Sequence, residues 1–414
     1  MRHTADVVIV GGGAAGLSLA HWITRTETDR TETDRAGLDV VVVEAPEGPL
    51  RPAERTWCFW DDGPGEYEPA VTAEWDRLRI TGPDGGAIEA APAPLRYRML
   101  RSIPFERLVH GRLAAHPRAR LLRAVVQEVR GGADGAEVRC VDAAGGRLTL
   151  HGRYVFDSRP PGRLPPARTT LLQHFRGWFV HTARPRFDPG TAQLMDFRVP
   201  QPDHGLAFGY VLPLAPDRAL VEYTEFSRRP LPVPAYEAAL RHYAGRVLGL
   251  GAYTVQGAEQ GVIPMTDARF PRRRGPAHFL VGAAGGATRP ATGYTFAAIQ
   301  RQSRAVAAAL AAGEPPGAAL VPPPHGRRAL AMDAVLLRAL DTGRIDGPRF
   351  FTGLFARAPA ERVLRFLDGG STPGEELGIG LRCPVGPMLR TAAELPFLRR
   401  RTPAPHPAHD EENR

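Results

Sequence analysis

Lysine is absent from this chain: all 53 basic side chains are arginine, and the formal net charge is +9. Arginine-rich nucleic-acid binders cluster their charges on one element, with aromatic residues between them. Here the arginines are scattered, which argues against a nucleic-acid partner, and the codon bias of a GC-rich genome accounts for most of the excess. A basic face resting on an anionic membrane stays open, because such a surface attracts each arginine by about 1 kcal/mol.

Cysteine is almost as scarce, and long apolar runs are missing. Cys58, Cys140 and Cys383 lie too far apart for a disulfide framework or a metal site, so we expect a reducing cytoplasm and no metal. No stretch approaches the ~20 apolar residues that span a bilayer. Residues 7–23 resemble a signal peptide, but Asp6 precedes them and glycines interrupt them. We therefore expect a cytoplasmic protein that is peripherally associated with the inner face of the cell membrane.

The chain opens with the pattern of a βαβ unit. A β-branched run at 6–10 predicts a buried parallel strand, a helix follows to about residue 25, and a second buried strand is expected at 38–43. Between helix and strand the pentapeptide Thr-Glu-Thr-Asp-Arg occurs twice, at 26–30 and 31–35. It extends the spacing to Glu44 beyond the usual ~20 residues. We expect a solvated loop there, where added length costs little.

The turn after the first strand carries the spacing Gly11-x-Gly13-x-x-Gly16. In such a turn the first glycine permits the bend, the second lets the backbone approach a pyrophosphate, and the third lets helix and strand pack closely. The N–H groups around Ala14 and Ala15 and the helix dipole favour the diphosphate. Glu44, at the end of the second strand, would accept hydrogen bonds from the adenosine ribose, which suits FAD or NAD.

A second glycine cluster lies far along the chain. Gly282, Gly285 and Gly286 are followed by Thr292 and Gly293, directly before a predicted helix. A helix N-terminus at this point would stabilise negative charge on a reduced flavin. Two glycine-rich turns near opposite ends of the chain favour FAD, whose dinucleotide needs contacts from both.

The remaining pattern predicts the organisation of the chain. We expect an α/β fold: an FAD-binding, Rossmann-like domain of the hydroxylase/reductase type, with an inserted antiparallel β-sheet substrate domain and a helical C-terminal part. The predicted units are residues 1–167 and 276–315 for the FAD-binding domain, 168–275 for the inserted sheet, 325–401 for the helical region and 402–414 for a disordered tail. Strands are predicted at 124–157, 171–180, 193–197, 207–214, 219–226 and 278–281, helices at 236–248, 295–312, 328–340 and 359–367, and a linker at 315–324.

Five segments, in order, resemble the bacterial lycopene β-cyclase family. They are Thr56-Trp57-Cys58-Phe59, Leu194-Met195-Asp196, Tyr210-Val211-Leu212-Pro213, Val221-Glu222-Tyr223-Thr224 and Pro290-Ala291-Thr292-Gly293-Tyr294. The resemblance implies a non-redox cyclisation of lycopene end groups to β-rings, with reduced FAD as cofactor and NAD(P)H as reductant. An end group is protonated, a neighbouring double bond attacks the cation, and a proton is lost. Asp157, after the strand at 154–156, resembles the central Asp that these folds share in the cofactor site.

The same resemblance makes Glu222 the candidate general acid. Protonating an alkene needs a carboxyl that stays neutral near pH 7, which an apolar surrounding achieves by raising its pKa. An exposed acid on an alternating strand is the plain alternative. Glu225, three residues on, would point to the opposite face of the strand. Asp196 is either a second acid or a structural hydrogen-bond acceptor.

Aromatic residues are the candidates for binding the substrate: Trp57, Phe59, Trp60 and Tyr294. Ring faces can stabilise a carbocation, but on a strand the first two share one face and Trp60 takes the other. Ordinary core packing therefore accounts for at least one of them. Two residues depart from the family pattern, because Tyr223 replaces an acid and Cys58 replaces a serine.

Two other classes remain open. A redox flavoprotein, either a monooxygenase or a prenyl reductase, would share the fold, although hydroxylases carry Gly-Asp where this chain has Gly282-Ala283. A flavin-free lipid-binding protein on the same fold is the non-enzymatic alternative. The sequence leaves open one or two rings per lycopene, β- or ε-rings, NADH or NADPH, and the oligomeric state.

Overall fold

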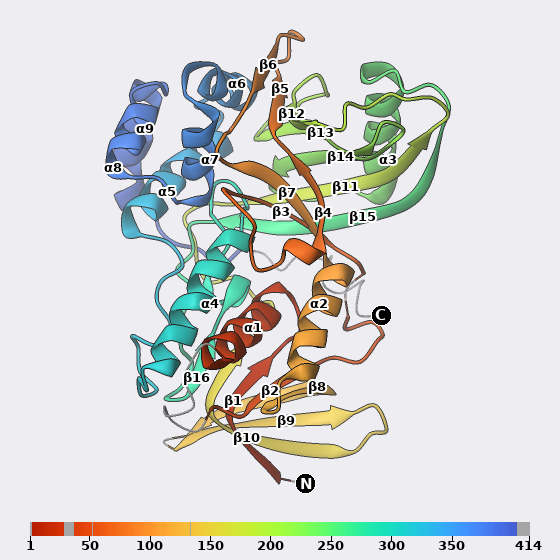
Figure 1. Cartoon of the computed structure of the whole chain (residues 1–414). Coiled ribbons are helices and arrows are strands. Elements are labelled where there is room, and N and C mark those ends of the chain that lie inside the picture. Colours follow the sequence, from red (N-terminus) through yellow and green to blue (C-terminus); the bar gives the residue numbers. More distant parts are fainter. Residues whose placement is uncertain (1, 29–36, 52, 133, 404–414) are drawn as a thin grey trace.

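The computed structural model describes residues 2–28, 37–51, 53–132 and 134–403. The tandem pentapeptide beyond residue 28 and the predicted tail beyond residue 403 lie outside this part of the chain. Two large sheets occupy opposite ends of the molecule, with helices between them and along one side (Figure 1). The chain crosses between the two ends more than once, so each end combines segments that are distant in sequence.

The first sheet has six strands in the order β1-β2-β8-β9-β10-β16, and β1 also pairs with β10. Its strands are β1 (Arg2–Val10), β2 (Val40–Glu44), β8 (Ala119–Gly132), β9 (Gly135–Asp142), β10 (Arg147–Asp157) and β16 (His278–Leu280). Val7 and Ile9 face the helices α1 (Ala14–Thr28), α2 (Ser102–Ala115) and α4 (Phe296–Ala311), whereas Val8 and Val10 face the β8–β9–β10 layer. Both faces of β1 are buried, which explains its unbroken apolar run.

The second sheet, called the large sheet below, has seven strands in the order β15-β11-β14-β13-β12-β5-β6. They are β5 (Arg77–Thr81), β6 (Ala87–Ala90), β11 (Thr170–Thr182), β12 (Thr191–Asp196), β13 (Leu206–Ala215), β14 (Arg218–Ser227) and β15 (Tyr253–Thr266). The predicted strands correspond to β11–β14, while β5, β6 and β15 were not predicted. β5 and β6 precede residue 168, so the sheet combines two separate segments of the chain.

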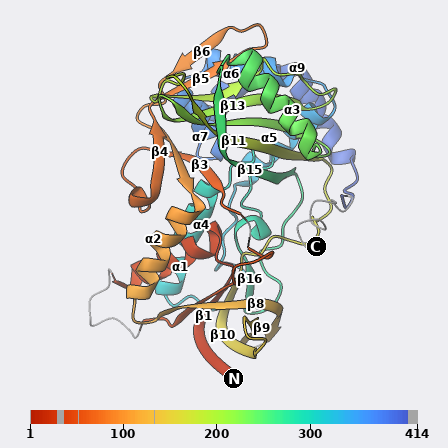
Figure 2. The ribbon, with the colours of Figure 1, turned by 90° about the vertical axis from the view of Figure 1, so that its right-hand side faces the viewer.

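One face of the large sheet is covered by α3 (Val233–His242), which continues into a π-helical turn at Tyr243–Val247. The predicted helix at 236–248 therefore ends its regular α-geometry earlier than expected. The opposite face, called the inner face below, looks toward a three-stranded sheet of β3 (Thr56–Asp61), β7 (Arg96–Arg101) and β4 (Val71–Trp75). This small sheet lies between the two large ones (Figure 2).

The C-terminal part is helical, as predicted. Its helices are α5 (Arg327–Asp341), α6 (Gly347–Arg357), α7 (Ala360–Asp368), α8 (Pro373–Gly380) and α9 (Val385–Glu394). Leu337 of α5 and Val363 of α7 join one hydrophobic cluster with Leu206 and Tyr97, which fixes these helices to the inner face and the small sheet. None of the helices in the described residues is both long and apolar enough to cross a membrane.

Candidate functional site

The first glycine turn has the geometry of a phosphate cradle. Gly11 adopts φ 100°, and α1 begins at Ala14 directly after the turn. A Cβ at Gly16 would overlap the carbonyl oxygen of Gly11, so only glycine lets the helix pack this closely on the strand. A Cβ at Gly13 would meet nothing within 4 Å. The backbone of Gly13 therefore borders open space, where an anion can approach the N–H groups of the first helical turn.

Glu44 lies beside this turn, as predicted. Its carboxyl carbon is 2.5 Å from the point where Gly12 would carry a Cβ. The buried carboxylate forms ion pairs with Arg51 at 3.1 Å and Arg123 at 3.0 Å, and Nε2 of His110 lies 3.3 Å away. Sequence analysis did not identify these basic partners, which come from a loop, β8 and α2. They hold Glu44 in place next to the turn.

The second glycine turn touches the first. Gly282 adopts φ 64°, and a Cβ there would overlap the side chain of Ala15 at the start of α1. The turn continues as a short 3-10 helix, Gly282–Gly285, and ends at Gly286 with φ 83°. Both turns therefore border the same space at the carboxyl ends of β1 and β16, as binding of one FAD molecule by both turns would require.

The segment before α4, which contains Thr292 and Gly293, connects the space between the two glycine turns to the large sheet. Gly293 adopts φ 73°, and a Cβ there would overlap the side-chain oxygen of Gln173 on β11. Thr292 donates its hydroxyl to the carbonyl of Leu367 at 2.8 Å, which leaves its backbone as the group that could face a cofactor. The second glycine region therefore meets both the cofactor turn and the inner face.

Asp157 ends β10 and is fully engaged within the protein. Its carboxylate accepts hydrogen bonds from the Arg159 backbone at 3.0 Å and from its guanidinium at 2.7 Å, and His278 lies 3.6 Å away. Although burial opposes it, the nearby His278 ring and the hydrogen bonds from Arg159 lower the pKa of Asp157 to about 2. The next residue, Ser158, bonds to the carbonyl of Val10 at 2.9 Å. Asp157 thus fixes the loop beside the first glycine turn, and its direct contact with a cofactor stays a prediction.

Glu222 lies on the inner face in a row that crosses four strands. Tyr210, Glu222, Gly177 and Glu259 are register partners on β13, β14, β11 and β15. Cross-strand partners project to the same side of a sheet. A Cβ at Gly177 would lie 3.4 Å from Oε2 of Glu222. The carboxyl of Glu222 therefore leans over the glycine, toward the strand that carries Glu259.

The two glutamates of this row have unusual proton affinities. Burial and the nearby Glu259 carboxyl raise the pKa of Glu222 to about 8, and the hydroxyl of Thr224, which donates to Glu222 at 2.6 Å, opposes this only in part. Burial also raises the pKa of Glu259 to about 7, against a hydrogen bond from Thr56 at 2.7 Å. These shifts favour the protonated form of the Glu222 carboxyl near pH 7, and its role as the general acid stays a prediction.

Tyr210, the cross-strand partner of Glu222, belongs to a group of aromatic side chains. The hydroxyls of Tyr210 and Tyr97 lie 2.5 Å apart. The ring of Trp60 lies 6.1 Å from that of Tyr97 and 4.5 Å from that of Tyr294. Cys58 lies among the tyrosines, and burial raises its pKa to about 12. The structure thus brings two predicted substrate residues, Trp60 and Tyr294, to the side of the sheet that carries Glu222.

The other two predicted substrate residues lie elsewhere. Trp57 and Phe59 project from the opposite face of β3, as the alternation predicted. The ring of Trp57 packs 5.5 Å from Phe105 of α2, and that of Phe59 packs 4.8 Å from Phe296 of α4. These contacts place both rings in the core of the first sheet's helical layer. The geometry supports a packing role for them rather than substrate contact.

Asp196 and Glu225 lie on the α3 side of the large sheet, away from Glu222. Asp196 is fully buried, pairs with Arg198 at 2.6 Å and accepts a hydrogen bond from Tyr243 at 3.1 Å. Glu225 accepts one from Tyr223 at 3.1 Å. The structure supports the structural alternative for Asp196, since its charge is neutralised on the far side of the sheet. Glu222 and Glu225 point to opposite faces, as predicted.

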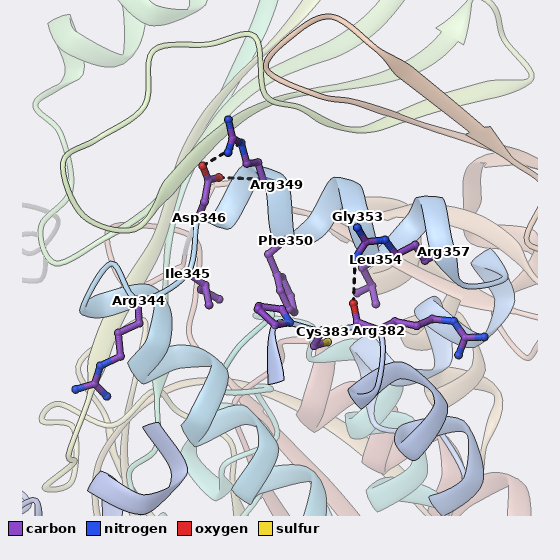
Figure 3. A pocket seen from close by; sticks show the side chains of 11 residues that line it. Arg344, Ile345, Asp346, Arg349, Phe350, Gly353, Leu354, Arg357, Arg382 and Cys383 are labelled. Carbon is purple, nitrogen blue, oxygen red and sulfur yellow. Dashed lines mark hydrogen bonds and ion pairs between the residues drawn. The ribbon is translucent and has the colours of Figure 1, made fainter. Parts of the chain in front are cut away.

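A surface pocket of about 250 Å³ lies apart from this site (Figure 3). It opens between α6, the turn before it and the turn between α8 and α9. Its lining includes Phe350 and Leu354 of α6 beside Arg357 and Arg382. None of the predicted site residues lines it, so we assign it no part in the chemistry. Among the described residues, no group of three or more His, Cys, Asp or Glu side chains could hold a metal ion.

Solved structures share this fold. A geranylgeranyl bacteriochlorophyll reductase-like protein from Thermoplasma acidophilum is 14% identical with a TM-score of 0.61, over 96% of this chain and 100% of that chain. A flavin-dependent monooxygenase, PieE, solved with FAD and substrate, is 16% identical with a TM-score of 0.56, over 92% of this chain and 72% of that chain. At such identities the likeness shows the fold alone, which is the FAD-binding fold of hydroxylases and reductases, as predicted.

The sequence places the chain within that class. The model of the family "Lycopene cyclase protein" matches residues 6–393, so the chain belongs to the lycopene cyclase family. An uncharacterized carotenoid cyclase from Deinococcus radiodurans is 29% identical over 90% of this chain and 88% of that protein. A lycopene beta-cyclase from a Paracoccus species is 30% identical over 66% of this chain and 74% of that protein. The family resemblance recognised in the sequence is confirmed.

Sequence analysis missed Glu259, Tyr97 and Gly177 as members of the site. Glu259 had a weak signal: small and acidic residues alternate at Gly257, Glu259 and Gly261, which fits a strand with one crowded face. Nothing local to Gly177 indicates that a carboxyl from the neighbouring strand leans over it.

Proposed function

We propose that this member of the lycopene cyclase family is a lycopene β-cyclase, which converts lycopene end groups to β-rings without net redox change. One observation carries the proposal. Glu222, at the family's acid position, is a buried carboxyl with a pKa raised to about 8, on a face bordered by Trp60, Tyr210 and Tyr294. A neutral carboxylic acid beside aromatic rings suits alkene protonation and a carbocation.

In this mechanism each side chain has a limited task. Glu222 gives its proton to the terminal double bond of the substrate, and the ring faces of Trp60 and Tyr294 stabilise the cation that results. Burial excludes water, which would otherwise capture the cation and yield an alcohol. Ring closure and loss of one proton complete the isomerisation, so the substrate gains and loses one proton and no electrons are transferred.

The proposal includes bound FAD. The residues fit the cofactor, because Gly13 borders open space, Gly282 contacts Ala15, and Glu44 lies beside Gly12. The backbone at Gly11, Gly13 and Ala14 would hold the diphosphate, Glu44 the ribose, and the turns at Gly282–Gly286 and Thr292–Gly293 the remainder. When bound and kept reduced by NAD(P)H, the flavin would supply negative charge to stabilise a nearby cation.

Cofactor binding is tested by Gly13→Val, which fills the space beside the turn. We expect the purified variant to lose its flavin absorbance. Gly63→Val is the matched control, because a Cβ at Gly63 also meets nothing within 4 Å but lies outside the glycine turns. Full flavin occupancy in Gly13→Val would refute this placement of FAD, and a colourless wild-type protein would favour the lipid-binding alternative.

The reaction is tested by expressing the chain in a lycopene-accumulating host. We expect products with β-rings and the mass of lycopene, because cyclisation is an isomerisation. A monooxygenase or a prenyl reductase would change that mass by adding oxygen or hydrogen. Ring counts and ring types in the same extract would separate γ-carotene, β-carotene and ε-ring products.

We also propose that the chain associates with the inner face of the cell membrane through α8 and α9. Leu377, Leu381, Val385 and Leu389 are exposed and recur every four residues along these helices. Such a row of exposed apolar residues, spaced evenly in the sequence over α8, the turn after it and α9, can mark an interaction site. Exposed arginines, Arg382 and Arg390, accompany the row, while the neighbouring acids Glu376 and Glu394 are already paired with other arginines. This combination suits an anionic lipid surface.

Flotation with phosphatidylglycerol vesicles tests the membrane surface. Leu381→Asp/Leu389→Asp should bind at least about tenfold more weakly than wild type, because two charges enter the apolar layer. Ile103→Asp is the control, since Ile103 is an exposed apolar residue on α2. Equal binding of the double variant, or no binding of wild type, would refute the proposal.

A further inference from the structure

A buried general acid creates a problem that the proposed cyclisation leaves unsolved. Each turnover leaves Glu222 as a carboxylate, and the side chain must regain a proton before the next substrate reacts. Glu222 is only 8% exposed and lies on β14, two strands from the edge of the large sheet. Direct exchange with water is therefore restricted, and a second group is needed to carry protons.

We infer that Glu259 is the proton relay of Glu222, connecting the buried acid to solvent at the edge of the large sheet. This inference rests on the proposed function, because a relay has meaning only if Glu222 transfers a proton.

The position of Glu259 carries the inference. It lies in the same cross-strand row as Glu222, separated from it only by Gly177, so the two Cα atoms are about 10 Å apart. The carboxyl of Glu222 leans over Gly177 in that direction. Gly177 has no side chain to separate the two carboxyls, and Cδ1 of Leu220, 2.8 Å from the place of its missing Cβ, is the nearest side-chain atom there.

The surroundings of Glu259 also suit a relay. β15 is the edge strand of the large sheet, and Glu259 is partly exposed there, whereas Glu222 is buried. The hydroxyl of Thr56 donates to Glu259 at 2.7 Å and fixes its carboxyl. Burial raises the pKa of both groups, and the Glu259 carboxyl raises that of Glu222 further, to about 8 against about 7 for Glu259. Proton affinities this close let a proton pass between the two groups with little loss of free energy.

The proton balance closes without another reactant. Glu222 gives one proton to the substrate, and the ring later releases one. Glu259 takes up that proton, or one from water, and returns it to the Glu222 carboxylate. After a turnover both carboxyls hold the protons they held before, and no electron has moved.

A structural role is the competing explanation, because the bond from Thr56 also ties β3 to β15. The first experiment separates the two with steady-state assays of the FAD-loaded enzyme. Glu259→Gln should lower turnover by about 10²-fold, the lower end of what a positioned proton-transfer group contributes, with KM and flavin content unchanged. Glu259→Asp should recover most of the loss. Glu225→Gln on the opposite face is the control.

Rescue by a small carboxylic acid distinguishes a proton relay from a structural role, because a purely structural defect would not respond to it. Glu259→Ala leaves room for an exogenous carboxylic acid, and propionate should restore turnover of this variant in proportion to its concentration. Propionate should leave wild type and Glu259→Gln unchanged. Turnover of Glu259→Ala that does not respond to propionate, or near wild-type turnover of Glu259→Gln, would overturn the relay.

A second measurement needs no activity. The protonated carboxyl of Glu222 can be followed by its infrared C=O band, assigned by its loss in Glu222→Gln. In Glu259→Gln the titration midpoint should move to lower pH by about one unit, since a neighbouring negative charge is removed. An unchanged midpoint would show that the two carboxyls are uncoupled and would overturn the relay. A wild type that makes no β-rings would instead refute the proposed function, whatever the infrared result.

Discussion

The two faces of the large sheet carry the same residue types in different surroundings. On the α3 face, Asp196 pairs with Arg198, and Glu225 lies between the hydroxyl of Tyr223 and His174, whose Nε2 is 3.7 Å away. On the inner face, Glu222 accepts a hydrogen bond from a neutral threonine and faces a second carboxyl. An arginine neutralises the charge of Asp196 on the α3 face, whereas on the inner face the pKa of Glu222 is raised.

This comparison shows why position along a strand decides the role of an acid. Glu222 and Glu225 are three residues apart, yet they meet different partners because side chains alternate between faces. Asp196, paired with Arg198, ties elements together on the α3 face, whereas burial and a nearby carboxyl raise the pKa of Glu222 on the inner face. The inner face can therefore do acid chemistry, and the α3 face provides stability.

The largest effect on turnover is expected from replacing Glu222 on the inner face, with replacement of Glu225 on the α3 face as the comparison. Glu222→Gln keeps the size of the side chain but removes the transferable proton, so turnover should fall by about 10²–10⁴-fold while FAD stays bound. Glu225→Gln should change turnover far less. Product formation from lycopene under reducing conditions, with flavin content measured in parallel, checks both. Near wild-type turnover in Glu222→Gln would show that another group is the proton donor.

The pH dependence should show the same contrast. Glu222 acts in its protonated form, and its pKa is raised to about 8. Cyclisation should therefore be sustained at neutral pH and fall about tenfold per unit above pH 8, as the acid ionises. The alkaline limb should be the same in Glu225→Gln, because that carboxyl lies on the far face. A limb centred near pH 4–5 would mean that burial does not hold the proton on Glu222.

The smallest effect on turnover should come from the α3 face. Asp196→Asn removes the charge that Arg198 neutralises, and loss of a buried charge-assisted bond costs about 1–3 kcal/mol. Thermal unfolding should begin a few degrees lower, with little change in turnover of the folded protein. If Asp196→Asn instead abolished turnover without lowering stability, the assignment of the two faces would have to be reversed.

Much of this arrangement could be predicted from local sequence. The glycine spacing at Gly11–Gly16, the flanking apolar runs and Glu44 depend on neighbours along the chain, and the βαβ unit was predicted with its turn. The alternation of side chains around Glu222 likewise predicted that Glu222 and Glu225 point to opposite faces of their strand. These features follow from backbone periodicity, which a single segment carries.

Non-local features could not be predicted in this way. β15 carries Gly257, Gly261 and Pro264, which weaken a strand pattern, and only pairing with β11 makes it a strand and brings Glu259 to the site. β5 pairs in parallel with β12 across more than a hundred residues. The partners of Glu44 and Asp196 were likewise unforeseen, because they come from segments that meet only in the folded chain.

The contact between Gly282 and Ala15 has a consequence for how the protein matures. These residues border the same proposed cofactor site, yet nearly two thirds of the chain lies between them, including all seven strands of the large sheet. A chain still being synthesised holds the first half of the cradle long before the second exists. The proposed flavin can therefore be retained only after the inserted sheet has folded and β16 has returned to β10. Supply of the cofactor should then raise the yield of full-length protein, because a ligand that binds only the folded state shifts the folding equilibrium toward it, and do nothing for fragments that end before residue 282.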